Sequence, residues 1–117
     1  MSGKVTIYHN PRCTKSRQTL QLIRDAGVEP EIVEYLKSPP TTAEVDSILK
    51  KLKMEPLEAM RHKEVAYSEL GLNGDTSRED AIRAMAENPI LIERPIVVRG
   101  RKAIICRPPE NVNNLLD

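Results

Sequence analysis

The sequence has few cysteines, almost no net charge and no long apolar run, and each shortage excludes a class of protein. Two cysteines in 117 residues are too few for a disulfide-stapled scaffold and indicate a reducing compartment. The 18 basic and 17 acidic side chains leave a net charge of +1, which gives no electrostatic case for binding nucleic acid or an anionic membrane. No apolar stretch reaches the roughly 18 residues of a membrane span, and the N-terminus lacks a signal-peptide core. We therefore expect a cytoplasmic protein without nucleic-acid or membrane partners.

The length predicts a single domain over residues 1–117. A chain of this size buries roughly two thirds of the surface that it exposes when unfolded, so it can form a hydrophobic core without disulfide bonds or a structural metal. No segment repeats internally, and prolines separate the periodic segments from one another. The composition favours a monomer.

The first part of the chain predicts a βαβ unit. Residues 4–9 alternate apolar and polar side chains, as in a strand, and residues 31–35 predict a second strand. Residues 14–26 predict a helix that Gly27 ends. Two strands joined by a helix in this way are parallel, with a right-handed crossover.

The last part predicts a β-hairpin and a helix. Residues 95–98 and 103–105 are apolar and flank Gly100, which supplies the positive φ of a tight turn. Pro108 stands near the start of a final short helix, where its missing N–H costs nothing.

The middle of the chain has the spacing of helices. Thr41 and Glu44 have the spacing of a capping box, and the apolar side chains that follow recur on one helix face. Further helical segments are expected at 56–62 and 77–87. The complete order predicts an α/β, thioredoxin-like fold (β-α-β … β-β-α) with a helical insert at about residues 41–88.

Cys13 stands where the first predicted helix begins. Backbone N–H groups at a helix start have no helical partner and the helix dipole is positive there, so a thiolate is favoured and the thiol pKa should fall below about 8.5. Ser16 is placed to donate a hydroxyl hydrogen bond, and three cations lie nearby in the sequence: Arg12, Lys15 and Arg17. The same N–H groups attract an oxyanion. We predict a reactive thiol beside an anion site; a capped cysteine in an ordinary turn is the alternative.

The spacing of residues around Cys13 argues against other kinds of cysteine site. A Cys-x5-Arg phosphatase loop would need Arg where Thr19 stands, and a Cys-x-x-Cys dithiol would need Cys where Ser16 stands. The two histidines and two cysteines make weak evidence for zinc, so we expect no metal. Cys106 ends an apolar run and is expected to pack as a small hydrophobic side chain. A lone thiol is compatible with monothiol redox chemistry, in which an external thiol resolves the intermediate.

Four separated segments carry a family resemblance: Ile7-Tyr8-His9-Asn10-Pro11-x-Cys13, Tyr67-x-Glu69-Leu70-Gly71-Leu72, Pro89-Ile90-Leu91-Ile92-x-Arg94-Pro95-Ile96-Val97-Val98 and Cys106-Arg107-Pro108. Together they resemble the ArsC family, the glutaredoxin-dependent arsenate reductases, over the length of the chain. The similarity is nearest to a shorter branch that has Arg-Cys-x-Lys-Ser-Arg at the cysteine loop.

The resemblance implies an arsenate reductase with no bound cofactor. The Cys13 thiolate would attack arsenate, glutathione as co-substrate would attack the arsenic, and glutaredoxin would resolve the mixed species and release arsenite. The family histidine that favours the thiolate matches His9, and its hydroxyl neighbour matches Ser16. The three arginines that surround the oxyanion match, by motif, Arg61, Arg94 and Arg107.

These residue types suit the chemistry. Guanidinium groups bind tetrahedral oxyanions through paired hydrogen bonds that Lys cannot reproduce, and they offset the repulsion between a thiolate and a dianion. In thioredoxin-like folds the proline at the position of Pro95 is typically cis and adjacent to the cysteine, which would aim Arg94. A solvated surface position is the alternative for Arg61 and Arg107.

One departure and two rival hypotheses stay open. The better-studied arsenate reductases have Gly-Thr after the cysteine, where this chain has Thr14 and Lys15, so the identity of the oxyanion is open. A related monothiol reductase that acts on glutathione adducts would use the same nucleophile. An Spx-like redox-sensing regulator that binds RNA polymerase would share the fold, but Ser16 replaces the second cysteine of its usual switch.

Overall fold

The computed structural model describes residues 4–116. Strand β1 (Val5–Tyr8) and strand β2 (Glu31–Val33) are parallel neighbours, and helix α1 (Thr14–Asp25) joins them. Gly27 follows the helix with φ +84°, a backbone conformation that glycine adopts without steric cost. The predicted βαβ unit is confirmed.

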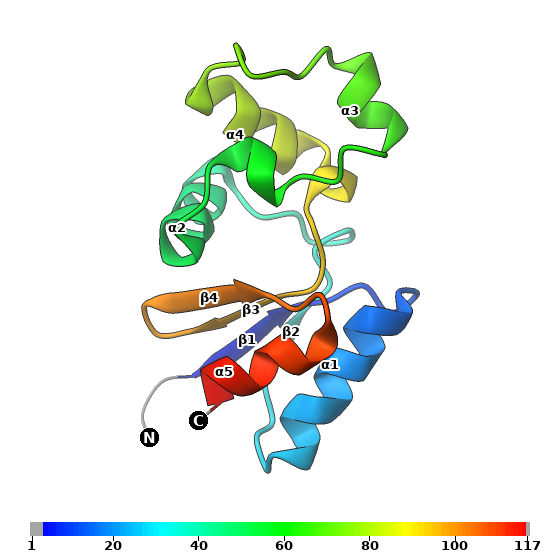
Figure 1. The fold of residues 1–117 in the computed structure, drawn as a ribbon, viewed down its shortest axis with the longest axis vertical. Helices are drawn as coiled ribbons and strands as arrows, with labels where there is room; N and C mark the ends of the chain where they lie inside the picture. Colours follow the sequence, from blue (N-terminus) through cyan, green and yellow to red (C-terminus); the bar gives the residue numbers. More distant parts are fainter. Residues whose placement is uncertain (1–3, 117) are drawn as a thin grey trace. The chain divides into compact units, whose positions relative to one another are not determined.

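The hairpin near the C-terminus completes the sheet. Strands β3 (Ile96–Arg99) and β4 (Lys102–Ile105) are antiparallel and are joined by a two-residue loop in which Gly100 has φ +61°. Strand β3 also pairs antiparallel with β1, so the strand order is β2-β1-β3-β4 (Figure 1). A parallel pair followed by an antiparallel hairpin is the predicted thioredoxin-like arrangement.

Helix α1 and the C-terminal segment cover one face of this sheet (Figure 1). The C-terminal segment is a 3-10 helix η3 (Pro109–Val112) followed by α5 (Asn113–Leu116). Arg99 Nη1 donates to the main-chain oxygens of Leu115 and Leu116, both at 3.0 Å, and so satisfies carbonyl groups at the end of α5. The buried side chains of this layer are Val5, Ile7, Ile23, Val97, Cys106, Val112 and Leu115.

The chain divides into two compact units. The sheet with its helices forms one, Met1–Ser38 with Arg94–Asp117, and Pro39–Glu93 forms the other. The second unit holds the helices α2 (Thr42–Leu52), η1 (Pro56–Ala59), α3 (Val65–Glu69), α4 (Arg78–Glu87) and η2 (Pro89–Leu91), of which η1 and η2 are 3-10 helices.

The capping box that begins α2 is confirmed. The Thr41 hydroxyl accepts the N–H of Glu44 at 3.1 Å, and the Glu44 carboxylate accepts the N–H of Thr41 at 2.9 Å. Helix α2 packs against α4, and the buried side chains of the two helices are Val45, Ile48, Leu49, Ala81, Ile82, Ala84 and Met85.

The segment expected to be helical at 56–62 is shorter than predicted. Helix η1 ends at Ala59 because Met60 turns to an extended backbone and pairs with Ile92 in an isolated antiparallel bridge. Helix α3 was not predicted; it has five residues, none of which is buried, so it leaves no apolar periodicity to detect.

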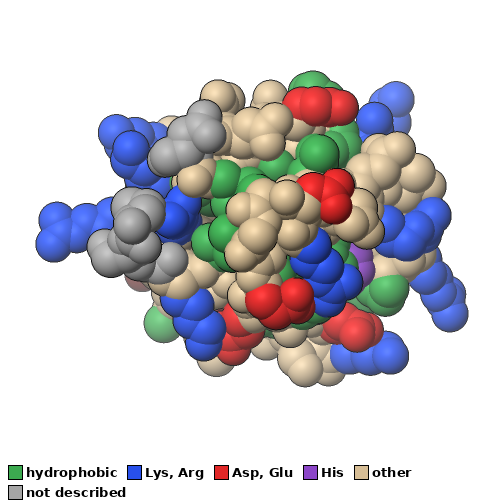
Figure 2. All heavy atoms as spheres, turned by 90° about the horizontal axis from the view of Figure 1, so that it is seen from below, with side chains coloured by type: hydrophobic (Ala, Val, Ile, Leu, Met, Phe, Trp, Pro, Cys, Tyr) green, Lys and Arg blue, Asp and Glu red, His purple; other side chains and the backbone are tan. Residues whose placement is uncertain are grey.

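The charged side chains of the face drawn in Figure 2 are of both signs, with hydrophobic atoms exposed between them. That face therefore carries no uniformly basic surface. Within residues 4–116, no helix has the length and apolar character needed to cross a lipid bilayer.

Candidate active site

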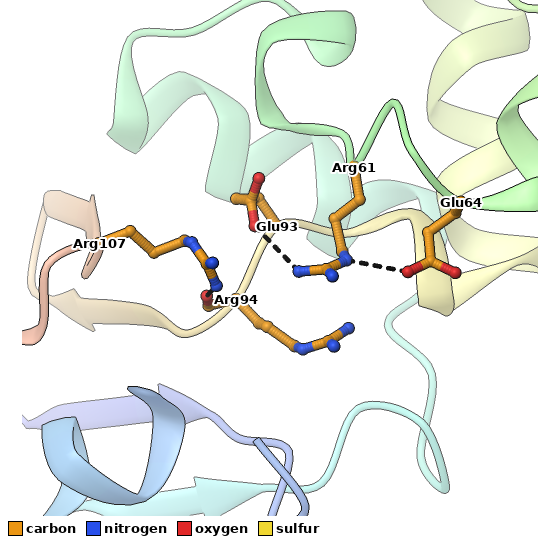
Figure 3. A network of polar contacts seen from close by, with 5 residues as sticks. All are labelled: Arg61, Glu64, Glu93, Arg94 and Arg107. Atoms are coloured by element: carbon orange, nitrogen blue, oxygen red, sulfur yellow. Dashed lines mark hydrogen bonds and ion pairs between the residues drawn. The ribbon is translucent and has the colours of Figure 1, made fainter. Parts of the chain in front are cut away.

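The register of the hairpin brings two predicted site arginines together. Ile96 pairs with Ile105, and the same register, continued past the strand ends, sets Arg94 opposite Arg107. Arg107 Nη1 donates to the main-chain oxygen of Arg94 at 3.1 Å (Figure 3). The peptide bond between Arg94 and Pro95 is cis, as predicted. The bond between Arg107 and the proline that follows it is also cis.

The pairing of β1 with β3 brings the cysteine loop to the same end of the sheet. Tyr8, the last residue of β1, pairs with Ile96, which lies two residues after Arg94. The chain then turns through the loop and enters α1 after Cys13. Residues distant in the sequence therefore meet because two strand registers coincide.

Cys13 is the N-cap residue of α1. Its thiol lacks the geometry of a full capping hydrogen bond, but the backbone N–H groups of Lys15 and Ser16, which an N-cap side chain faces, act on it together with Arg94. Burial on its own would raise the pKa of Cys13; the N–H groups and Arg94 outweigh burial, and the pKa lies below its ordinary value. The predicted lowering of the thiol pKa is confirmed.

The hydroxyl of Ser16 is used elsewhere than predicted. Its Oγ lies 2.6 Å from His9 Nδ1 and accepts the N–H of Asn10 at 3.0 Å. The prediction that this hydroxyl donates to Cys13 is therefore wrong, because the contribution of Ser16 to the thiol is its backbone N–H. All three bonded residues are buried, so they fix the bend between β1 and α1. Burial also lowers the pKa of His9 and so favours its neutral form.

Arg94 interacts with both Cys13 and Tyr35. Burial alone would lower the pKa of Arg94, but its interactions with the Cys13 thiolate and with Tyr35 raise it. Tyr35 is fully buried and follows β2 by two residues. Tyr35 was not predicted, although it follows the second of two parallel strands, and parallel strands end at the same edge of a sheet.

Three cations near the thiol in sequence are exposed: Arg12, Lys15 and Arg17. Arg17 donates to the main-chain oxygen of Pro11 at 2.8 Å and to the hydroxyl of Thr14 at 3.2 Å, and so braces the loop. The largest contributions that lower the pKa of Cys13 come from backbone N–H groups and from Arg94. Lys15 acts on the thiol through its backbone N–H, and a role for the three side-chain charges stays a prediction.

Arg61 lies in the unit Pro39–Glu93, where two carboxylates hold it. Its Nε donates to Glu64 Oε2 at 3.1 Å, and its Nη1 donates to Glu93 Oε1 at 3.3 Å (Figure 3). The exposed fractions of the three side chains are 23%, 27% and 25%, so this cluster is largely shielded from water. Neither carboxylate was predicted, although the spacing from Arg61 to Glu64 is that of an ion pair on a helical turn.

Cys106 is fully buried and belongs to the core of the sheet unit, as predicted. Burial raises the pKa of its thiol to about 12, so Cys106 is inert where Cys13 is activated. Within residues 4–116, no group of three or more His, Cys, Asp or Glu side chains is placed to hold a metal ion.

A family model described as the ArsC family matches residues 8–115, a range that includes Cys13 and the three predicted arginines. The chain belongs to the ArsC family. This confirms the resemblance drawn from the four sequence segments. Those segments include the cysteine loop and the two ends of the hairpin, where Arg94 and Arg107 lie.

Related proteins align with this ArsC chain over almost its whole length. The arsenate reductase of Rhizobium meliloti (strain 1021) is 49% identical over 114 residues, which are 96% of this chain and 81% of that protein. The uncharacterized protein YfgD of Escherichia coli (strain K12) is 53% identical over 114 residues, 96% of each chain. The solved structure of the arsenate reductase from Vibrio cholerae matches with a TM-score of 0.93 at 42% identity, covering 97% of this chain and 98% of that one.

Proposed function

We propose that this ArsC chain is an arsenate reductase with Cys13 as its nucleophile. The observation that carries the proposal is the Cys13 thiol at the start of α1, with a pKa lowered by two backbone N–H groups and by Arg94. Relatives named arsenate reductase, such as those of Rhizobium meliloti at 49% and Neisseria meningitidis at 43% identity, support arsenate as the substrate.

The first half of the reaction builds an arsenic adduct on the enzyme. The Cys13 thiolate attacks arsenate, an S–As bond forms, an As–O bond breaks, and the oxygen leaves as water after it is protonated. The thiol of glutathione then displaces a second oxygen, again as water, so that arsenic(V) carries two sulfur ligands.

The second half transfers two electrons. A glutaredoxin thiolate attacks the glutathione sulfur and forms a mixed disulfide, while the electron pair of the broken S–As bond stays on arsenic, which becomes arsenic(III). Water hydrolyses the bond between Cys13 and arsenic, which releases arsenite and restores the thiol. Each turnover oxidises one glutathione thiol and one glutaredoxin thiol to a disulfide.

The arginines compensate negative charge during these steps. Arg94 interacts with the sulfur in the resting enzyme, so it is placed to bind the oxyanion that the sulfur attacks. Arg107 contacts the backbone of Arg94 and adds a second guanidinium. The role of Arg61 rests on the family motif. Removing one such donor costs on the order of 3 kcal/mol of transition-state stabilisation.

We also propose that the protein works as a cytoplasmic monomer that meets glutathione and glutaredoxin as diffusing partners. Its two cysteines are free, as thiols are in a reducing compartment, and a single reactive thiol needs external thiols to complete the cycle.

The test is an arsenate reduction assay on purified protein with glutathione and glutaredoxin. Turnover should disappear in Cys13→Ser and persist in the control Cys106→Ala, whose sulfur lies in the core. If arsenate is not reduced but glutathione adducts are, the protein is instead a deglutathionylating reductase. If neither reaction occurs and RNA polymerase co-purifies, it is a regulator.

A further inference from the structure

We propose that Tyr35 is a positioning residue of the active site, and that its hydroxyl orients the guanidinium of Arg94 toward Cys13. The inference rests on the proposed function in one respect, that Arg94 also binds the oxyanion that Cys13 attacks. It adds to the cysteine and the arginines a residue that acts on the thiol and on the oxyanion through Arg94.

The strand registers place Tyr35 and Arg94 at the same end of the sheet. Tyr8, the last residue of β1, pairs with Val33 of β2 on one side and with Ile96 of β3 on the other. Tyr35 lies two residues after Val33, and Arg94 lies two residues before Ile96. The two residues therefore leave the sheet where β1 ends, from the strands on either side of it.

The backbones of both residues are held by hydrogen bonds. The N–H of Ser38 donates to the main-chain oxygen of Glu34 at 2.9 Å, which closes a turn that contains Tyr35. The main-chain oxygen of Arg94 accepts from Arg107 Nη1 at 3.1 Å. The side chain of Arg94 extends away from Arg107 (Figure 3) and interacts with the hydroxyl of Tyr35.

Burial strengthens the contact between the two side chains. Tyr35 is fully buried, and its hydroxyl oxygen is shielded from water, as are Nε and Nη1 of Arg94. A polar contact from which water is excluded is stronger than one in solvent. The long side chain of an arginine loses much conformational freedom when it is fixed, so a buried acceptor that fixes it in advance leaves less to be lost when a ligand binds.

The phenol suits this task because it carries no charge near pH 7 and its oxygen can accept an N–H. Tyr35 therefore orients the guanidinium without neutralising it. Arg61, in contrast, donates to two carboxylates. The positive charge of Arg94 stays available for Cys13, whose pKa it lowers, and for an oxyanion.

The first test compares two variants that each lose one phenol hydroxyl. Tyr35→Phe keeps the buried ring, and the control Tyr67→Phe keeps the ring that stacks on His62 in the unit Pro39–Glu93. In a Cys106→Ala background, the rate of alkylation against pH gives the acid dissociation constant of Cys13. Tyr35→Phe should lower this constant about three- to tenfold, which is a rise in the thiol pKa. Tyr67→Phe should leave it unchanged.

The second test measures oxyanion binding without turnover. In a Cys13→Ser background, titration calorimetry gives the Kd for arsenate and for inorganic phosphate. Tyr35→Phe should weaken both by about three- to tenfold, and Tyr67→Phe should weaken neither. In an Arg94→Ala background, Tyr35→Phe should change neither the oxyanion Kd nor the thiol pKa, because its effect passes through the guanidinium.

A measurement with Tyr35 intact covers the case in which Tyr35→Phe does not fold. In Cys13→Ser, NMR should show nuclear Overhauser contacts between the ring protons of Tyr35 and the Nε proton of Arg94, whose signal is identified by its loss in Arg94→Lys. The contacts should persist when inorganic phosphate is added. Their absence, or their loss on adding phosphate, would overturn the proposal.

A less stable Tyr35→Phe with an unchanged thiol pKa and an unchanged oxyanion Kd would limit Tyr35 to the core and overturn the proposal. An effect of Tyr35→Phe that persists without Arg94 would overturn it as well. These results are distinguishable from a failure of the proposed function. The thiol pKa and the phosphate Kd can respond to Tyr35 in a protein that does not reduce arsenate, and an active reductase can lack any effect of this hydroxyl.

Discussion

Arg107 donates to the main-chain oxygen of Arg94 across the open end of the β3–β4 hairpin, at 3.1 Å. The register that joins them is set by the two-residue loop at the other end, where Gly100 has positive φ. A change in loop length would shift the pairing and separate the two guanidinium groups. The position of the site thus depends on a turn at the far end of the hairpin.

Arg94→Lys should lose most of the activity while the fold is retained. The substitution keeps the charge but removes the planar fork that binds an oxyanion through paired hydrogen bonds. We expect kcat/KM for arsenate to fall about a hundredfold. Steady-state kinetics measures the loss, with Arg83→Lys as a matched control on the exposed face of α4. Turnover close to that of the control would exclude bidentate binding by Arg94.

Arg107→Lys should cost less, about tenfold in kcat/KM. Arg107 is exposed, and its contact with Arg94 is one hydrogen bond to a carbonyl oxygen that an ammonium group can also reach. The same assay checks the order of the two effects. A greater loss for Arg107→Lys than for Arg94→Lys would make Arg107 the principal oxyanion ligand.

Ser16→Ala should lower stability and leave the thiol pKa nearly unchanged. The hydroxyl partners of Ser16 are His9 and the N–H of Asn10, all buried, and leaving buried polar groups unpaired costs about 1–3 kcal/mol. The thiol instead depends on the Ser16 backbone N–H, which the substitution keeps. Urea unfolding measures the first effect and alkylation against pH the second. A large rise in the pKa of Cys13 would instead show that the Ser16 hydroxyl stabilises the thiolate.

The two cysteines should give stability opposite dependences on pH. Cys106 titrates near 12 when folded and near 8.5 when unfolded, so its contribution is complete below about 8.5 and is lost as pH rises toward 12. Cys13 has a lowered folded pKa, so its contribution is present above about 8.5 and is lost as pH falls through the folded pKa.

Urea unfolding between about pH 6 and 10 measures both contributions. Cys106→Ala should remove the alkaline decline, and Cys13→Ser should remove the rise that precedes it. Unchanged pH profiles in the two variants would contradict the assigned environments of the sulfurs.

The sequence was sufficient for features that depend on local spacing. The βαβ unit, the hairpin and the capping box of Thr41 follow from periodicity and turn residues, and the lowered pKa of Cys13 follows from its place at a helix start. The family motifs added the cis bond before Pro95 and the candidate arginines.

The side chains that contact these site residues could not be predicted from the sequence. Tyr35 reaches Arg94 because two strands end at one edge, and Glu93 reaches Arg61 because a bridge aligns segments about 30 residues apart. The direction of the Ser16 hydroxyl depends on a backbone bend that spacing does not encode. Tertiary contacts, more than residue identity, decide what each side chain of the site does.

The rate of Cys13 alkylation, measured against pH, reports whether the backbone N–H groups and Arg94 hold this sulfur as a thiolate. In Cys106→Ala, Cys13 is the thiol that is alkylated, and we expect a midpoint below the value of about 8.5 for a free thiol, which rises when Arg94 is replaced by Gln. A midpoint at or above about 8.5, unchanged by that replacement, would contradict it.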